Sequence, residues 1–539
     1  MRRWNGWGDE ANKMDLPPTG EQFLSDLVGA SSPLADAQLS EVLAQVPESR
    51  LPEHILIDKD PEQRLRHSRG QSLPDWLAMR SGRFEFFPDG VAFPETKDQV
   101  AELVEFCYEH DIILIPYGGG TSVAGHINPF ESDEPILTLS LGRMTRLIDL
   151  DEESQIATFG AGTPGPLVES QLRSRGYTLG HFPQSFELST IGGWVASRSS
   201  GQQSLRYGRI EQMFAGGSVE TPKGRMDIQT IPASAGGPDV REIFMGSEGR
   251  MGVISEVKVR VTPLAEQEDF YVIFFPSWTQ AKEAARYMVQ SKVQLSMLRL
   301  SNAVETTTQL ALAGHPGQIS MLEKYLSFKG AAEGKCMMTL GITGLPEQCR
   351  PAHKLMKSMI RRYHGVYTGN FLGKKWADKR FKMPYLREAL WEKGYVVDTL
   401  ETATDWDNVD NLLNKIEDNL RNSLSAENEK VHVFTHLSHF YGQGCSIYTT
   451  YVYRAGESCE QALERWKHMK SSTSEIIVNN RGAISHQHGV GKDHAPFLPK
   501  EKGELGMHLI KTAFAAMDEK GLLNPGTLIE DDRVKSLFD

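Results

Sequence analysis

Cysteine is scarce in this 539-residue sequence, and its spacing excludes the usual cysteine-based sites. The cysteines are odd in number and scattered, and no two of them form a CxxC pair. Neither a disulfide framework nor a zinc site is therefore predicted. We expect free thiols at Cys107, Cys336, Cys349, Cys445 and Cys459.

Long apolar runs are lacking as well. Charged residues interrupt every apolar stretch before the roughly 20 residues that a membrane-spanning helix needs. The N-terminal residues MRRWNGWGDE contain no apolar core of a signal peptide. We therefore expect a cytoplasmic protein, and peripheral association with a membrane stays open.

No segment of the chain is strongly basic. Lys and Arg together number 58 against 70 Asp and Glu, which gives a net charge of −12. Proteins that bind DNA or RNA need a cluster of cations that neutralises phosphates. Nucleic acid is therefore not expected as a partner.

What is present is the composition of an ordinary globular protein, with 40% apolar and 24% charged residues. The length predicts two to four domains. We place a lead segment with two short helices (20–29 and 35–46) at residues 1–86. A first domain follows at 87–264, and a second, α+β domain at 265–530, whose last residues return to the first domain.

Apolar periodicity predicts the main elements of both domains. In the first domain a helix face over 100–107 precedes a short buried strand at 112–115. We expect further strands at 136–141, 146–150, 156–159 and 253–261, with a helix at 167–175. In the second domain we expect strands at 270–275, 336–342, 431–437 and 445–453, with helices near 279–290, 351–364, 408–422 and 457–479.

A run of glycines follows the predicted strand at 112–115 and reads Pro116-Tyr-Gly-Gly-Gly-Thr-Ser-Val123. Main-chain amides can approach a diphosphate closely where no Cβ intervenes. The run matches neither GxGxxG nor GxxxxGK[ST], which disfavours a nicotinamide site and a P-loop. Taken alone it is more often a tight turn, but glycine-rich turns recur at 160–162, 189–194 and 246–249.

These segments resemble those of the vanillyl-alcohol oxidase superfamily, whose PCMH-type FAD-binding domain uses loops like PYGGGTSV, GAGT, TIGGWVAS and GSEGRMGVISE. The resemblance implies an α+β fold and FAD as the cofactor. Some members attach FAD through a histidine in the loop, but Thr121 occupies that position here, so noncovalent FAD is expected. The cofactor-binding residues so implied are Pro116, Tyr117, Gly118, Gly119, Gly120, Thr121, Ser122, His181, Pro183, Ser185, Ser189, Thr190, Gly192, Gly193, Trp194, Ser197, Ser200, Glu248, Gly252, Val253 and Ile254.

Within that superfamily the sequence is most similar to the alkyldihydroxyacetonephosphate synthase family. The motifs are WNGWG (4–8), IPYGGGTSV, the block GHFPQSFELSTIGGWVASRSSG (180–201), MLRL (297–300), YLREALWEKGY (385–395), CSIYTTY and ISHQHGVGK. The resemblance implies a transferase of ether-lipid synthesis. Such an enzyme exchanges the acyl chain of acyl-dihydroxyacetone phosphate for a fatty alcohol through a flavin N5 adduct. A homodimer is expected.

The same resemblance assigns the reacting groups. Tyr448 in SIYTT matches the catalytic tyrosine of the family, and Arg299 and Arg387 match two arginines that line its active site. A guanidinium suits phosphate or carboxylate, so both are also candidate substrate ligands, together with Ser247. His486 and His488 are further candidate catalytic residues, and they flank Gln487, where the family has a third histidine. Glutamine cannot transfer a proton, so either Tyr448, His486 or His488 has taken over that role or the reaction has changed.

Two other functions stay open. The first is an FAD-dependent dehydrogenase or oxidase of a 2-hydroxy acid or another alcohol. Its metal-dependent relatives carry an acidic ligand where this chain has Gln487, so no metal is predicted. The second is a flavin-binding or lipid-interface protein without catalysis, with the helix near 457–477 as a partner surface. The retained tyrosine, arginines and histidines favour chemistry.

Overall fold

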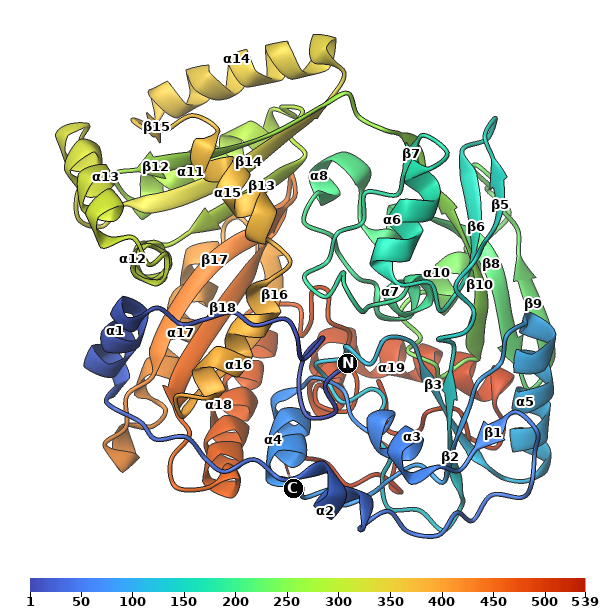
Figure 1. Cartoon of the computed structure of the whole chain (residues 1–539). Helices are drawn as coiled ribbons and strands as arrows, with labels where there is room; N and C mark the ends of the chain where they lie inside the picture. The colour runs from blue at the N-terminus through green and yellow to red at the C-terminus, as the bar shows by residue number, and fades with distance from the viewer. Residues whose placement is uncertain (539) are drawn as a thin grey trace.

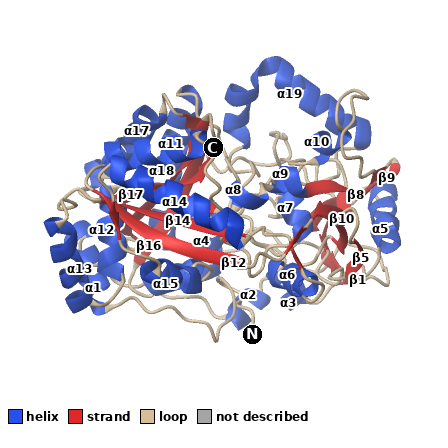
Figure 2. Ribbon diagram, turned by 90° about the horizontal axis from the view of Figure 1, so that it is seen from above, coloured by secondary structure: helices blue, strands red, loops and turns tan. Residues whose placement is uncertain are grey.

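The computed structural model describes residues 1–538, which form two groups of strands with an interface between them (Figure 1). Figure 2 shows the larger sheet on the left and the five-stranded sheet on the right, with α7 (Ile191–Ser197), α8 (Ser204–Tyr207) and α9 (Ile210–Met213) between them. Among the described residues, none of the helices has the length and apolarity needed to cross a membrane.

The first group contains two main sheets. One has the order β1-β2-β4-β3, with parallel pairing of β4 to both β2 and β3. The other is antiparallel, in the order β5-β6-β10-β8-β9, and β7 pairs with β11 beside it. Their bounds are β1 Ile57–Asp58, β2 Gly90–Ala92, β3 Ile113–Tyr117, β4 Ile136–Ser140, β5 Leu147–Asp151, β6 Ile156–Gly160, β7 Tyr177–Thr178, β8 Phe214–Thr221, β9 Gly224–Ile228, β10 Val253–Arg260 and β11 Thr262–Pro263.

Helices in the first 264 residues are short apart from α5. Its Thr96 N-cap accepts a hydrogen bond from the amide of Gln99, as a helix start of this kind requires. The helices not yet given are α1 Pro18–Val28, α2 Leu39–Leu43, α3 Pro61–Arg66, α4 Leu73–Ser81, α5 Lys97–Glu109, α6 Gly165–Arg173 and α10 Val240–Phe244.

The second group is one antiparallel seven-stranded sheet in the order β15-β12-β14-β13-β17-β18-β16. Its strands are β12 Gln267–Phe275, β13 Met297–Ser301, β14 Cys336–Gly344, β15 Val366–Tyr367, β16 Tyr395–Asp405, β17 His432–Phe440 and β18 Gly444–Arg454. Its helices are α11 Trp278–Gln290, α12 Ala303–Leu312, α13 Pro316–Phe328, α14 Pro346–Arg362, α15 Phe371–Lys379, α16 Leu386–Trp391, α17 Val409–Asn422, α18 Cys459–Asn479 and α19 Leu498–Met517, with 3-10 turns at Met383–Tyr385, Ser425–Glu427 and Ala495–Phe497.

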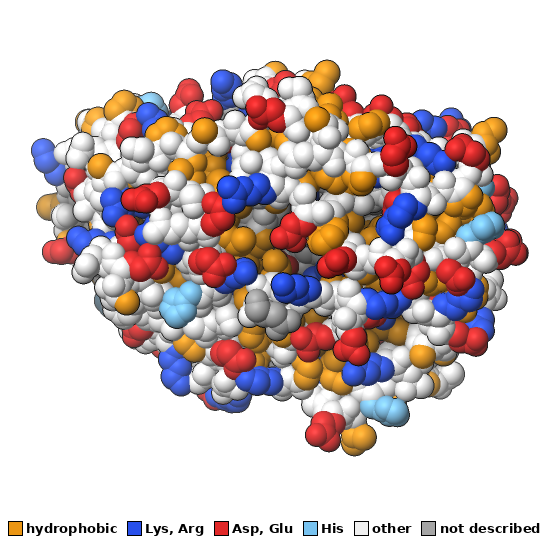
Figure 3. Space-filling view, turned by 90° about the horizontal axis from the view of Figure 1, so that it is seen from below, with side chains coloured by type: hydrophobic (Ala, Val, Ile, Leu, Met, Phe, Trp, Pro, Cys, Tyr) orange, Lys and Arg blue, Asp and Glu red, His pale blue; other side chains and the backbone are white. Residues whose placement is uncertain are grey.

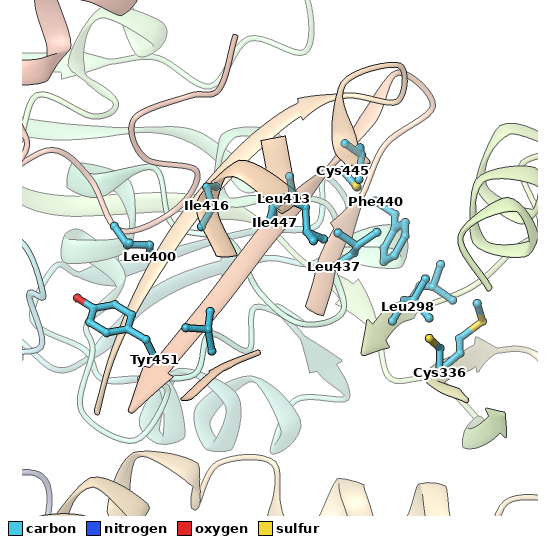
Figure 4. Close-up of a cluster of buried hydrophobic side chains, with 14 of the residues drawn as sticks. Leu298, Cys336, Leu400, Leu413, Ile416, Leu437, Phe440, Cys445, Ile447 and Tyr451 are labelled. Carbon is cyan, nitrogen blue, oxygen red and sulfur yellow. The ribbon is translucent and has the colours of Figure 1, made fainter. Parts of the chain in front are cut away.

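One face of the seven-stranded sheet is covered by α11, α14, α17 and α18, which together with the strands form the largest apolar core. Figure 4 shows part of it, where Leu413 and Ile416 of α17 lie near Ile447 and Leu437 of the strands. Side chains alternate along a strand, so the neighbours Tyr448, Thr450 and Val452 face the other way. That second face of the sheet is turned toward the first group of strands.

Both ends of the described chain join the two groups. Trp7 and Trp76 belong to the core of the larger sheet, whereas Leu51 belongs to the core of the smaller ones. Near the C-terminus the amide of Leu114 donates to the carbonyl of Leu522, and the amide of Asn524 donates to the carbonyl of Leu114. The division of the chain at residues 86 and 264 stays a prediction.

The predicted elements largely agree with the structure, and one prediction is wrong. The segment 189–194, expected as a glycine-rich turn, instead opens α7, because the Thr190 side chain accepts the hydrogen bond of the Gly193 amide and caps the helix. Five helices of the second half, α12, α13, α15, α16 and α19, and the strands β13, β15 and β16 were not predicted.

The surface carries charges of both signs. On the face in Figure 3, Lys and Arg side chains are interspersed with Asp and Glu, and single apolar side chains lie among them. No basic patch of the kind that binds nucleic acid appears on this face.

Candidate active site

A cavity of about 520 Å³ lies between the two groups of strands. Its first wall comes from the glycine loop at 116–123 and the segment 183–202, and its second from β13, β16, β17 and β18. Residues from the chain's first 71 positions, Trp7, Leu24 and Gln71, also line it. We call it the central cavity.

The glycine loop presents free main-chain donors to the central cavity. In the part of the chain that the structure describes, the amides of Gly118 to Ser122 have no hydrogen-bond acceptor, although all of these residues line the cavity. Buried N–H groups are nearly always paired, and consecutive free ones form an anion site. The loop therefore fits the diphosphate of FAD.

The glycines are also required by packing within the protein. A Cβ on Gly119 would clash with the main-chain carbonyl of Leu188, and one on Gly118 with the Thr190 hydroxyl. Gly120 adopts a φ of +68°, which L-residues with a side chain rarely adopt. The loop and the segment before α7 are thus held in close contact.

Most of the sequence-predicted cofactor residues line the central cavity. They are Pro116, Tyr117, Gly118, Gly119, Gly120, Thr121, Ser122, Pro183, Ser185, Ser189, Thr190, Gly192, Gly193, Trp194, Ser197, Ser200, Glu248, Gly252 and Ile254. Their role toward FAD stays a prediction.

Three predicted residues of this wall do not reach the cavity. Val253 lies fully buried in the core of the smaller sheets. Ser247 is buried too, and its amide donates to the carbonyl of Phe244. The ring of His181 packs on Trp194 at 4.6 Å, and its Nε2 lies 3.1 Å from the Ser199 hydroxyl. These side chains can support the wall but do not line it.

Glu248 joins the glycine loop to the C-terminal loop. Its carboxylate accepts hydrogen bonds from the amides of Val490 (2.6 Å) and Gly491 (2.8 Å), and it lies 3.0 Å from Nε2 of His126. Nδ1 of His126 lies 2.5 Å from the Ser122 hydroxyl. Nδ1 of His126 is hydrogen-bonded to the loop, whereas Nε2 lies beside the Glu248 carboxylate without a hydrogen bond, so this histidine holds the loop in place through Ser122.

On the opposite wall, three polar residues form a row across adjacent strands. Glu401 on β16 is directly opposite Tyr448 on β18, and Tyr448 is directly opposite His436 on β17. Residues opposite each other in antiparallel strands share a face. The Tyr448 ring stacks on His436 at 4.9 Å and meets His488 edge-on at 6.0 Å. The predicted catalytic tyrosine therefore lies in a cluster of polar rings.

The Tyr448 hydroxyl donates a hydrogen bond to Thr399 Oγ1 at 3.2 Å. Burial raises the pKa of Tyr448 to about 12, and the charges of Glu401 and Asp398 act in the same direction. The phenol is therefore protonated at neutral pH. In this state it can act as an acid or a hydrogen-bond donor, and it must first lose its proton to act as a base.

The two predicted arginines have different environments. Arg299 donates to Glu305 at 2.6 Å, so its charge is already balanced. Arg387 stacks on Trp76 and donates only to the carbonyl of Gln71 at 2.7 Å. Its Nε and Nη2 have no partner among the described residues. Since buried cations require a counterion, Arg387 is the stronger candidate for an anionic substrate group.

The 486–488 loop is fixed by one buried carboxylate. Oε1 of Glu401 accepts hydrogen bonds from the amides of His486 (3.0 Å), Gln487 (2.8 Å) and His488 (3.0 Å), and from the Ser485 hydroxyl. Burial disfavours its charge, yet the two histidines and these donors hold the pKa of Glu401 well below its ordinary value. Sequence analysis missed this residue.

The loop turns its three side chains in different directions. Gln487 and His488 line the central cavity, whereas His486 does not. The Nε2 atom of His486 lies 2.6 Å from the Tyr441 hydroxyl and 3.1 Å from Arg209 Nη1. Burial lowers the pKa of both histidines. Of the two predicted catalytic histidines, only His488 is therefore within reach of a substrate in this conformation.

Sequence analysis also missed His436, Glu305 and His439. The alternation of the predicted strand at 431–437 places His436 on one face with Phe434, and this pattern could have indicated it. No local pattern indicates Glu305 on α12 as its partner. His439 lies 3.1 Å from the hydroxyl of Ser200 and 3.3 Å from that of Ser204 through its Nδ1.

Metal ligands do not cluster in residues 1–538: no group of three or more His, Cys, Asp or Glu side chains has the geometry to hold an ion. At the position where metal-dependent relatives have an acidic ligand, this chain presents the amide of Gln487 to the cavity. The expectation of a metal-free site stays a prediction.

Comparison with known proteins matches both halves of the chain. Residues 88–227 match the family described as FAD binding domain, and residues 264–528 match that described as FAD linked oxidases, C-terminal domain. FAD is therefore the cofactor of this fold, as predicted.

Similarity over the full length of the chain shows which FAD-linked enzymes it resembles. The chain is 28% identical over 587 aligned positions to alkyldihydroxyacetonephosphate synthase of Dictyostelium discoideum, covering 100% of this chain and 95% of that protein. A solved alkyldihydroxyacetonephosphate synthase superposes with a TM-score of 0.83 at 24% identity, over 97% of this chain and 98% of the other. A solved p-cresol methylhydroxylase shares the fold, with a TM-score of 0.66 at 13% identity, over 93% and 99% of the two chains. The chain therefore combines an FAD-binding domain with the C-terminal domain of FAD-linked oxidases, and over its full length it is similar to alkyldihydroxyacetonephosphate synthases.

Proposed function

We propose that this protein exchanges the acyl chain of acyl-dihydroxyacetone phosphate for a fatty alcohol and so forms the ether bond of an ether lipid. The observation that carries the proposal is the central cavity. It joins a diphosphate-binding loop, a polar reaction centre and an apolar extension in one space.

The apolar extension follows from the register of the sheet. The row Glu401, Tyr448 and His436 is polar, and the next row along the strands is Thr399, Thr450 and Phe434. The row after that is Val397, Val452 and His432, and the His432 ring contacts Phe434. We call the apolar arm the part of the cavity lined by Phe434, Val397, Val452, Leu24, Leu312, Leu386 and Leu390. A long alkyl chain fits this arm because burial of each methylene group is favourable by about 0.8 kcal/mol.

The polar end supplies the groups that the head of such a substrate needs. Arg387 offers a free guanidinium edge to a phosphate or carboxylate. Tyr448 lines the cavity and holds a proton at neutral pH that it can donate to a bound substrate. FAD, when bound at the glycine loop, supplies an electron sink for a reaction without net oxidation or reduction.

A dehydrogenase or oxidase of a 2-hydroxy acid is the second candidate. The unpartnered guanidinium edge of Arg387 would suit a small carboxylate equally well. The apolar arm favours the lipid substrate, because a small polar acid leaves its side chains unused.

Anaerobic mixing separates the two reactions. The purified holoenzyme is mixed with acyl-dihydroxyacetone phosphate, or in parallel with 2-hydroxy acids, and the flavin spectrum is followed together with the products. We expect fatty acid release with bleaching of the flavin but no net reduction, and an ether product once fatty alcohol is added. Lasting flavin reduction by a 2-hydroxy acid, with no ether product from the lipid, would rule out the transferase.

Contact with a membrane and assembly as a homodimer stay predictions. The exposed side chains Met321, Tyr325 and Phe328 recur on one side of α13, beside α12, whose Leu312 lines the apolar arm. Such a surface can rest on lipid. Sedimentation of the protein with phospholipid vesicles tests the contact, and light scattering of the protein alone tests the dimer.

A further inference from the structure

His436 has the surroundings of a general base. Its Nδ1 lies 3.1 Å from Oε1 of Glu305, a carboxylate buried on α12. Its Nε2 has no hydrogen-bond partner within residues 1–538, and the residue lines the central cavity. A histidine with one nitrogen held by a buried carboxylate and the other free in a reaction cavity is the arrangement of a catalytic dyad.

The charge of Glu305 decides which nitrogen carries the proton. Burial opposes that charge, but His436 and the guanidinium of Arg299, both hydrogen-bonded to the carboxylate, outweigh burial and lower the pKa of Glu305 to about 2. An ionised carboxylate can only accept hydrogen bonds. Nδ1 also lies 3.1 Å from Nη2 of Arg299, but that group already donates to Oε1 of Glu305 at 2.6 Å. We therefore assign the imidazole proton to Nδ1, in the hydrogen bond to Glu305, which leaves the Nε2 lone pair facing the cavity.

The neutral form prevails at neutral pH. Burial and the nearby Arg299 lower the pKa of His436, and Glu305 acts in the opposite direction. The other ionisable groups around the ring are Tyr448 on β18, which is protonated at neutral pH, Glu401 one strand further, and His439 on its own strand. The imidazole is thus ready to accept a proton.

His436 also lies where the hydroxyl of an amphiphilic alcohol would come to rest. On β17 the next cavity-lining residue in one direction is Phe434 of the apolar arm, and in the other direction it is Ser438 of the polar end. An alkyl chain that fills the apolar arm therefore brings its hydroxyl to the row of His436 and Tyr448. Gln487, on the facing loop, cannot accept a proton.

We propose that His436 is a catalytic residue that removes the hydroxyl proton of the incoming alcohol, and that Glu305 is its positioning residue. The inference rests on the proposed function and names the base for its second half. The bond from the substrate carbon to the acyl oxygen breaks, and its electron pair leaves with the carboxylate. The alcohol oxygen forms the new bond to that carbon, while its proton passes to Nε2 and then to solvent. No net oxidation or reduction occurs.

Two half-reactions measured separately test the proposal. Fatty acid release is followed in a single turnover without alcohol, and ether formation is followed after a fatty alcohol is added. For His436→Gln we expect fatty acid release at a rate comparable to wild type. Ether formation should slow by about a hundredfold or more, the usual scale for a lost general base. An alcohol made more acidic by fluorine at its second carbon should recover much of the loss.

His353→Gln is the matched control, because His353 on α14 contacts Tyr367 and does not line the cavity. It should leave both half-reactions unchanged. In Glu305→Gln the acid limb of the ether-formation rate should move to lower pH, because loss of the carboxylate lowers the pKa of His436. A purely structural role of Glu305 would leave that limb in place.

The outcomes distinguish failure of the proposed function from failure of the proposed role of His436. Wild-type enzyme that forms no ether product refutes the proposed function, and the inference falls with it. Ether product from wild type together with an unimpaired second half-reaction in folded, flavin-loaded His436→Gln refutes only the role of His436. Equal impairment of both half-reactions, with no benefit from the more acidic alcohol, also refutes it.

Discussion

Glu401 and Tyr448 lie directly opposite each other on β16 and β18, so the carboxylate that fixes the 486–488 loop and the predicted catalytic phenol belong to one row of the sheet. The loop thereby holds His488 against the Tyr448 ring. A change at either residue therefore disturbs the contact between His488 and Tyr448. The stability of the site and its chemistry thus depend on the same pair of strands.

Tyr448→Phe should keep FAD bound and suppress turnover by about a hundredfold or more, the scale of a lost acid or base group. Among residues 1–538 the hydroxyl makes only the hydrogen bond to Thr399, so its loss should change folding little. Steady-state kinetics and the flavin content of the same preparation check this. Turnover at the wild-type rate would reduce Tyr448 to a packing residue.

Glu401→Gln should destabilise the fold by about 2 kcal/mol, because three main-chain amides lose a charged acceptor. The pKa of Glu401 is lowered in the folded state, so its contribution is present above the unfolded pKa, near 4.5, and disappears as pH falls toward the folded value. The variant should therefore lose less stability than wild type below about pH 4.5. Denaturant unfolding at several pH values measures both effects, with the exposed Glu392→Gln as control.

Arg387→Lys should raise the KM for acyl-dihydroxyacetone phosphate by about tenfold or more, the scale of one lost charged hydrogen bond. A lysine cannot both stack on Trp76 and present two donors to an anion. FAD content should not change. The control is Arg83→Lys, at a surface ion pair with Glu460. An unchanged KM would show that Arg387 only supports Trp76 and Gln71.

Gly119→Ala should lower the FAD content of the purified protein. The new Cβ would clash with the main-chain carbonyl of Leu188, which cannot move without shifting the backbone. The control is Gly442→Ala, where a Cβ would meet nothing within 4 Å. The ratio of flavin to protein absorbance measures the effect. Full occupancy in Gly119→Ala would argue against a tight fit between the loop and the segment before α7.

His432→Gln should make the free energy of unfolding decrease less steeply as the pH is lowered from 6.5 to 4.5. Burial, together with the charge of Arg421, lowers the pKa of His432 to about 4, whereas an unfolded histidine titrates near 6.5. The unfolded state therefore binds one more proton between these values, and stability falls as pH decreases, by up to about 1.4 kcal/mol per pH unit. Unfolding free energies between pH 6.5 and 4.5 check this, and an unchanged slope in the variant would contradict it.

The glycine loop and the orientation of Tyr448 could be predicted from sequence, because both depend on residues that are neighbours along the chain. Three glycines after a buried strand determine where main-chain amides can approach an anion, and the alternation of 445–453 determines that Tyr448 and Ile447 face opposite sides. Motif similarity added FAD and the synthase-like family, which the comparisons confirm.

The chemistry around Tyr448 was decided by tertiary structure. His436, Glu305 and Glu401 come from separate elements, and only the strand register of β16, β18 and β17 brings them into one site. The sequence motifs predict the same role for Arg299 and Arg387. In the described structure, however, Arg299 is paired with the carboxylate of Glu305, and no carboxylate among residues 1–538 pairs with Arg387. Backbone conformation depends on neighbouring residues along the chain. The pairing of buried charges depends instead on which segments, distant in sequence, pack against each other in the folded protein.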